Sequence, residues 1–213
     1  MIITFATQKG GAGKTTLAIA FSNYLKILNP ELEINVYDYD YQRSFYEKWK
    51  TDKLGERPPL YDVKYIDDTN PLSIEQIWNL EESDAYTIID LPGSLDIEYM
   101  PLLMYSNYII IPFEYSDVST HSTLTFNEFL NEIDTQSERI FIRSKYDKSY
   151  NYVNQLSLDE KLKSYGLLIK NPVYKRNILQ KIDTTGLNYD QKYAIRKAFN
   201  EIIEKIKHDK SII

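Results

Sequence analysis

A glycine-rich segment near the start of the chain carries the residues needed to bind phosphate. Residues 8–16 read Gln-Lys-Gly-Gly-Ala-Gly-Lys-Thr-Thr, between an apolar run at 2–7 and an amphipathic run at 15–28. The glycines permit a tight turn in which several backbone N–H groups point at one anion, and the helix that follows presents its positive end to it. Lys14 can neutralise the β- and γ-phosphates of a nucleotide, and the Thr15 hydroxyl can bind Mg²⁺. We therefore expect the nucleotide phosphates to be held by Gly10, Gly11, Ala12, Gly13, Lys14, Thr15 and Thr16.

Three carboxylates follow apolar segments that are predicted to be strands. Asp38 and Asp40 lie at the end of the run 34–39, and alternate residues of an extended segment face the same way. The pair can therefore point at one site, although taken alone it could equally consist of capping or solvated acids. Asp90 ends the apolar run 86–89 and is a candidate to hold Mg²⁺ directly or through water, the alternative being a simple turn former.

The loop departs from the general phosphate-loop pattern in its first residues. Gln8 occupies a position where that pattern has glycine, and an extra lysine, Lys9, follows it. The sequence Lys-Gly-Gly-x-Gly-Lys-Thr at residues 9–15 resembles the deviant Walker A motif of the ParA/MinD family, whose members are ATPases that dimerise around nucleotide. The resemblance implies that Lys9 reaches across the dimer to the partner's ATP, where it would act like an arginine finger supplied in trans.

The same family resemblance assigns roles to the carboxylates. Residues 38–42 resemble the family's Asp-x-Asp-Pro-Gln segment, with Tyr41 where the family has proline. This implies that Asp40 positions the attacking water and that Asp38 supports the magnesium ion from behind its direct ligands. The residues expected to act in catalysis are then Lys9, Lys14 and Asp40, and those expected at the metal are Thr15, Asp38 and Asp90.

Later segments carry the resemblance through most of the chain. The strand-like run 109–112 ends in proline as it does in the family, and Asn171-Pro172, followed by Arg176 and Gly186, resembles the family's adenine-side loop. Pro172 is therefore expected to contact the nucleotide. The resemblance extends from about residue 1 to residue 187 and is greatest to short ParA proteins, which implies ATP and Mg²⁺ as ligands and an ATP-dependent homodimer.

Apolar runs alternate with amphipathic stretches along the chain. Strands are predicted at 2–7, 34–39, 63–66, 86–91, 108–112, 139–143 and 167–169. Helices are predicted at 15–28, 43–51, 73–80 (with Ser73 as its cap), 118–133, 158–165 and 190–208. This alternation predicts a single α/β domain over 1–213, a mostly parallel twisted sheet with helices on both faces. The loop at 8–16 and the family resemblance imply that this is the P-loop NTPase fold. Ligands of such folds bind at the carboxyl ends of the strands.

Composition narrows the classes of function. The chain has 213 residues, 43% of them hydrophobic and 26% charged, which is enough apolar surface to form a core. It has no cysteine, which excludes disulfides, thiolate zinc sites and cysteine-ligated clusters, and with them nitrogenase-reductase-like chemistry. No signal peptide and no apolar run of about 18 residues is present, so we expect a cytoplasmic protein without stable membrane insertion. The 19 tyrosines are interpreted as half-buried boundary residues.

Two cellular roles fit the resemblance. A ParA-type partition ATPase would bind DNA without sequence preference, associate with the nucleoid in its ATP form and respond to a ParB-like adaptor. The basic residues available for DNA, each of which could also be part of a solvated helix face, are the cluster Lys192, Arg196 and Lys197 and, elsewhere in the sequence, Lys161, Lys163, Lys175 and Arg176. A MinD-like protein would instead cycle on membranes through its C-terminal helix, but the tail 209–213 is too short to anchor strongly.

Overall fold

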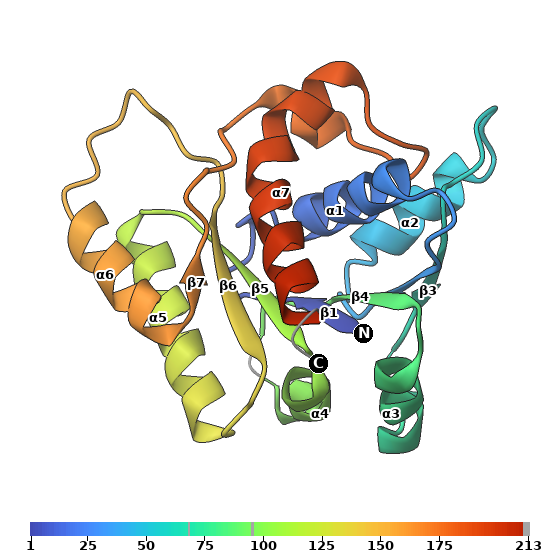
Figure 1. Ribbon diagram of the computed structural model, residues 1–213, viewed down its shortest axis with the longest axis horizontal. Helices are drawn as coiled ribbons and strands as arrows, with labels where there is room; N and C mark the ends of the chain where they lie inside the picture. Colours follow the sequence, from blue (N-terminus) through green and yellow to red (C-terminus); the bar gives the residue numbers. More distant parts are fainter. Residues whose placement is uncertain (68, 95, 211–213) are drawn as a thin grey trace.

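All strands of the computed structural model lie in one parallel sheet, as the alternating sequence pattern predicts (Figure 1). The structure describes residues 1–67, 69–94 and 96–210. Within them the sheet has seven strands in the order β3-β2-β4-β1-β5-β6-β7. The strands are β1 (Ile2–Phe5), β2 (Ile34–Asp38), β3 (Asp62–Tyr65), β4 (Tyr86–Asp90), β5 (Tyr108–Phe113), β6 (Glu138–Arg143) and β7 (Leu167–Leu168).

Helices cover both faces of this sheet (Figure 1). One face is covered by α1 (Lys14–Leu28), α2 (Ser44–Asp52) and α7 (Tyr189–Lys210), whose apolar side chains share one core cluster with the strands. The other face is covered by α3 (Ile74–Glu82), α4 (Met100–Tyr105), α5 (Asp117–Glu132) and α6 (Gln155–Tyr165), which share a second cluster. Alternate strand residues supply the two clusters, so Ile3 packs on one face and Ile2 on the other.

The strand register aligns the residues that lead into the site. Phe5 at the end of β1 lies opposite Asp90 of β4, and Asp90 lies opposite Asp38 of β2. These parallel strands therefore end level with one another, and the two carboxylates emerge at the same edge as the glycine-rich loop. The order of the strands, with β1 between β4 and β5, is a feature that the sequence pattern did not specify.

Local chemistry accounts for where the main helices begin and end. Gly13 has φ 82, in the left-handed region that glycine adopts without strain, and α1 begins at the next residue. Ser73 caps α3 as predicted, in a reciprocal capping box with Gln76. The apolar side of α7 is buried on the sheet through Ile195, Ala198, Phe199, Ile202, Ile203 and Ile206. The apolar face of this amphipathic helix is therefore used to pack against the sheet.

Several short elements were not predicted. The six-residue helix α4 follows the 3-10 turn η1 (Ile97–Tyr99), and a second 3-10 segment, η2 (Asn177–Lys181), precedes α7. Helix α4 is too short to show a period in the sequence and is held by burial of Leu102 and Leu103. The remaining predicted bounds agree with the structure within three residues, the largest shift being the start of α6 at Gln155 instead of 158.

Among the described residues, no helix is both long and apolar enough to cross a membrane. Residues 211–213 of the C-terminal tail, for which weak membrane anchoring was considered, lie outside the described part of the chain.

Candidate nucleotide-binding site

The glycine-rich loop connects β1 to α1 at the carboxyl edge of the sheet. Gly11 and Gly13 both have φ 82, a conformation that side chains with a Cβ rarely adopt. A Cβ on Gly13 would also lie 3.1 Å from the Ser144 hydroxyl, and one on Gly93 would lie 3.3 Å from the backbone nitrogen of Gly10. The loop is therefore packed between the ends of β4 and β6; conformation and space both favour glycine at Gly13, and conformation alone favours it at Gly11.

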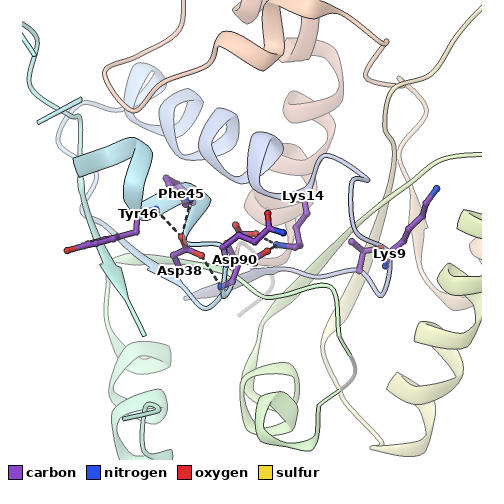
Figure 2. A network of polar contacts seen from close by, with 9 residues as sticks. Lys9, Lys14, Asp38, Phe45, Tyr46 and Asp90 are labelled. Atoms are coloured by element: carbon purple, nitrogen blue, oxygen red, sulfur yellow. Dashed lines mark hydrogen bonds and ion pairs between the residues drawn. The ribbon is translucent and has the colours of Figure 1, made fainter. Parts of the chain in front are cut away.

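Lys14 lies inside the site and is held by two carboxylates (Figure 2). Its Nζ donates a hydrogen bond of 2.6 Å to Asp90 Oδ1 and lies 3.6 Å from Asp40 Oδ2. The Lys14 and Asp90 side chains are 7% and 0% exposed. Burial raises the pKa of the Asp90 carboxyl, and the charge of Lys14 opposes that shift. The second oxygen of Asp90, Oδ2, is buried and has no hydrogen-bond partner among the described residues.

Asp38 organises the loop between β2 and α2. Its Oδ1 accepts a hydrogen bond from the backbone N–H of Asp40 at 3.0 Å. Its Oδ2 accepts from the N–H groups of Phe45 and Tyr46 at 3.1 and 2.9 Å, in the first turn of α2 (Figure 2). The pKa of Asp38 is raised to about 6 by burial and, to a smaller extent, by the charge of Asp90, while the backbone N–H groups oppose the shift. Asp38 therefore fixes the position of Asp40, in keeping with an indirect role at a metal.

Lys9 points away from this cluster, as Figure 2 shows. Its Nζ donates a hydrogen bond of 3.2 Å to the hydroxyl of Ser116, which caps α5. The two lysines of the loop thus face in different directions. Lys14 serves the site formed by its own chain, while the Lys9 ammonium is directed outside it.

A cavity of about 630 Å³ adjoins the loop beside Gly13 and Thr16. Tyrosine side chains form much of its wall, namely Tyr115, Tyr146, Tyr150, Tyr152 and Tyr174. Their rings pack on one another, with centroids of neighbouring rings 4.8–6.0 Å apart. Tyrosines that the sequence suggested were boundary residues are therefore gathered around one cavity, whose aromatic faces suit a planar base.

Beneath this wall lies a buried polar network. The Arg143 guanidinium pairs with Asp159 Oδ2 at 2.6 Å and donates a hydrogen bond of 2.5 Å to the Tyr115 hydroxyl, which itself donates to Asp159 Oδ1. Arg143 ends β6 and Asp159 lies on α6, so the network ties that helix to the sheet. Burial raises the pKa of the Tyr115 hydroxyl, so it stays a neutral donor.

The adenine-side residues expected from the sequence fall partly on this cavity. Arg176 lines it, while Pro172 does not and instead precedes Val173, which does. Lys145, directly after β6, also lines the cavity and was missed by the sequence analysis. Its position just beyond a predicted strand was the signal that could have revealed it, since the carboxyl ends of parallel strands carry the site.

The donors present suit a magnesium ion that is bound together with nucleotide. No group of three or more His, Cys, Asp or Glu side chains able to hold a metal occurs in residues 1–67, 69–94 and 96–210. Mg²⁺ in nucleotide sites needs only one or two protein oxygens, because the phosphates and water supply the others. The buried, unpartnered Oδ2 of Asp90 fits that requirement, and Thr15 in the first turn of α1 would supply the second oxygen.

A glycine-rich loop between a parallel strand and a helix, with a buried lysine facing strand-end carboxylates, defines a phosphate-binding site of the P-loop class. Comparison with known families makes the assignment specific. Residues 3–209 match the family described as the CobQ/CobB/MinD/ParA nucleotide binding domain. The chain therefore belongs to that family, and the resemblance deduced from residues 9–15 is confirmed.

Solved structures show the same fold at low sequence identity. A putative plasmid partition protein from Borrelia burgdorferi B31, bound to AMPPNP, is 22% identical with a TM-score of 0.72, covering 96% of this chain and 98% of that one. The MinD of a MinC:MinD cell division complex from Aquifex aeolicus is 16% identical with a TM-score of 0.69, covering 95% and 96%. The pNOB8 ParA bound to nonspecific DNA is 14% identical with a TM-score of 0.63, covering 98% and 99%. No curated protein matches the chain.

Proposed function

We propose that this chain is a Mg²⁺-dependent ATPase that dimerises on ATP, binds DNA without sequence preference and hydrolyses ATP to partition or position DNA cargo. The observation that carries the proposal is the opposite orientation of the two loop lysines. Lys14 faces the buried carboxylates of its own chain, while Lys9 is hydrogen-bonded to Ser116 outside them. An ammonium in that position can serve the phosphates of a second copy but not those of its own site.

The chemistry follows from the placement of the polar groups. Lys14 would move from Asp90 to the β- and γ-phosphates, because phosphate oxygens are strong acceptors for an ammonium group. Asp40, held by the Asp38-organised loop, would orient the attacking water. A bound Mg²⁺ neutralises phosphate charge, and Asp90 and Thr15 would hold it. The partner's Lys9 would stabilise the charge that develops as the γ-phosphate leaves.

An exposed patch at the start of α7 supports DNA binding. Tyr189 and Tyr193 stack with ring centroids 6.4 Å apart. The Arg196 and Arg176 guanidinium groups lie 4.9 and 6.0 Å from the Tyr193 ring centroid. Arg176, which the sequence placed apart from Arg196, thus joins it on one surface, which we call the α7 patch. Arginines of this kind neutralise DNA phosphates without reading bases, and the nearby Lys192 and Lys197 add positive charge.

Membrane cycling of the MinD kind is less well supported. A MinD-like protein would lay the apolar face of α7 on a lipid surface. In this structure that face packs on the sheet through residues such as Phe199 and Ile202. That face would have to leave the core to contact lipid. A ParB-like adaptor remains the expected partner of the partition role, and nucleoid association the expected location of the ATP-bound form.

Co-sedimentation with plasmid DNA or with anionic liposomes, with and without ATP, tests the proposal. We expect ATP-dependent pelleting with DNA, which is lost in the double variant K192A/R196A, because these two positive charges belong to the α7 patch and neither residue lines the nucleotide cavity. The double variant K161A/K163A is the matched control, because it removes two charges from exposed positions on α6, on the opposite face of the sheet. Pelleting with liposomes instead would favour the MinD-like role, and equal loss in both double variants would remove the α7 patch as the DNA surface.

The roles of the loop and carboxylate residues have separate tests. Lys9→Ala is expected to keep nucleotide binding but to lose dimerisation-dependent hydrolysis, measured by light scattering and phosphate release. Asp40→Ala is expected to accumulate an ATP-bound dimer. An unaffected rate of hydrolysis in either variant would reassign the role of that residue.

A further inference from the structure

A third lysine reaches the phosphate loop from a different strand. Lys145 follows β6, and its ammonium donates a hydrogen bond to the carbonyl oxygen of Gly11, in the middle of the loop. The same Nζ lies 3.4 Å from Glu114 Oε1. Lys145 has φ 51, a left-handed conformation that is disfavoured for a residue with a Cβ. An unfavourable backbone conformation is thus retained at the residue whose ammonium group contacts the loop.

The position of Lys145 indicates which end of a nucleotide it would meet. Lys145 lines the tyrosine-walled cavity together with Gly13 and Thr16, whereas the Lys14 ammonium points to Asp90, outside that lining. A Cβ built on Gly13 would lie 3.9 Å from the Lys145 Cε, so the lysine stem passes beside the end of the loop. The backbone of such loops cradles the α- and β-phosphates, while the loop lysine reaches the β- and γ-phosphates. Lys145 is therefore placed at the base-proximal phosphates.

We propose that Lys145 binds the α- or β-phosphate of the nucleotide within its own chain, as a binding residue additional to the loop. This inference rests on the proposed nucleotide-binding function. Its side chain is 45% exposed, so it can change partners without leaving a buried site. Glu114 and the Gly11 carbonyl are the acceptors it leaves as nucleotide binds. The exchange is favourable because a phosphate offers several charged oxygens to one ammonium.

Calorimetric titration of ATP and ADP into Lys145→Met and the wild type tests this assignment. We expect both nucleotides to bind at least about 10-fold more weakly to the variant, and by a similar factor, because one charge-assisted hydrogen bond to a phosphate they share is lost. Lys148→Met is the matched control. It removes the same charge from the same loop, but the Lys148 ammonium lies over the Tyr174 ring at 4.7 Å and Lys148 is not among the residues that line the cavity. We expect its affinities to stay within about twofold of the wild type.

Several results would overturn the assignment. Unchanged ADP affinity in Lys145→Met, a loss confined to ATP, or an equal loss in Lys148→Met would each do so. Recovery of wild-type affinity in the double variant E114Q/K145M would also do so, because Lys145 would then act only by neutralising Glu114. If Lys145→Met does not fold, Glu114→Gln carries the test: freeing Lys145 should strengthen ADP binding, and weaker or equal binding refutes the assignment. A wild type that binds no nucleotide would instead refute the proposed function.

Discussion

Replacing Lys14 by methionine is expected to destabilise the protein strongly even without nucleotide. Lys14 supplies the hydrogen bond to Asp90 Oδ1, Asp90 is fully buried, and its Oδ2 has no hydrogen-bond partner among the described residues. Removing one member of a buried ion pair leaves an uncompensated charge and costs about 3–5 kcal/mol. Asp90→Asn should cost less, about 1–2 kcal/mol, because the Lys14 Nζ stays 3.6 Å from Asp40 and keeps a carboxylate partner.

Urea unfolding, monitored by tryptophan fluorescence, measures the difference in unfolding free energy between Lys14→Met and Asp90→Asn. Lys50→Met is the control, since the Lys50–Glu47 pair is exposed and separated by 4.0 Å, and its loss should cost under about 1 kcal/mol. The pH dependence gives a second criterion. Burial raises the pKa of Asp90 in the folded state, so its ionisation weakens folding as the pH rises through that pKa, more so without Lys14. The deficit of Lys14→Met should therefore shrink in acid. A Lys14→Met variant that is no less stable than Asp90→Asn, or whose loss of unfolding free energy grows in acid, would refute the reasoning.

Three further outcomes are expected. Tyr41→Phe removes a hydroxyl that lies 3.3 Å from Glu98 Oε1. Hydrogen-exchange mass spectrometry should then show faster amide exchange at residues 41–43 and around Glu98, and urea unfolding should show a stability loss of about 1 kcal/mol. Since the folded-state pKa of Asp38 is about 6 against an ordinary 3.8, its ionisation weakens folding as pH rises between them, and Asp38→Asn should reduce that slope in unfolding titrations. Arg143→Met should cost about 3 kcal/mol, and a double-mutant cycle with Asp159→Asn should show strong coupling.

The parts of the site that the sequence predicted are those that follow directly from local rules. The loop at 8–16 lies between a strand and a helix, and Asp38 and Asp90 each end an apolar strand. In a parallel sheet such ends emerge at one edge, so the sequence could predict that these residues share that edge. Their meeting also requires β2, β4 and β1 to be neighbours, which the sequence did not specify. The register that aligns Phe5, Asp90 and Asp38 confirms the reasoning.

The parts that escaped prediction depend on long-range packing. The position of Lys145 just beyond a predicted strand indicates this edge of the sheet, but its contact with Gly11 depends on how the segment after β6 and the loop after β1 pack there. Arg176 and Arg196 meet at Tyr193 because η2 turns back toward the start of α7. The tyrosine wall gathers residues from the segments after β5, β6 and β7. The positions of the tyrosines along the chain show only that they are scattered.

Three lysines near the phosphate loop each have a partner within the protein. Lys14 is bound by Asp90, Lys145 lies beside Glu114, and Lys9 is hydrogen-bonded to Ser116. A bound nucleotide must therefore compete with these acceptors, which lowers its net affinity. The same competition couples nucleotide binding to the binding of a cation at Asp90. If Lys14 moves to phosphate as proposed, Asp90 would lose its counter-charge, and a divalent cation would be the group best able to compensate the buried carboxylate. By linkage, a cation held at Asp90 then favours the phosphate-bound position of Lys14 by the same free energy. Nucleotide and Mg²⁺ should consequently bind with positive cooperativity, and the exchange of partners at Lys14 is its physical origin.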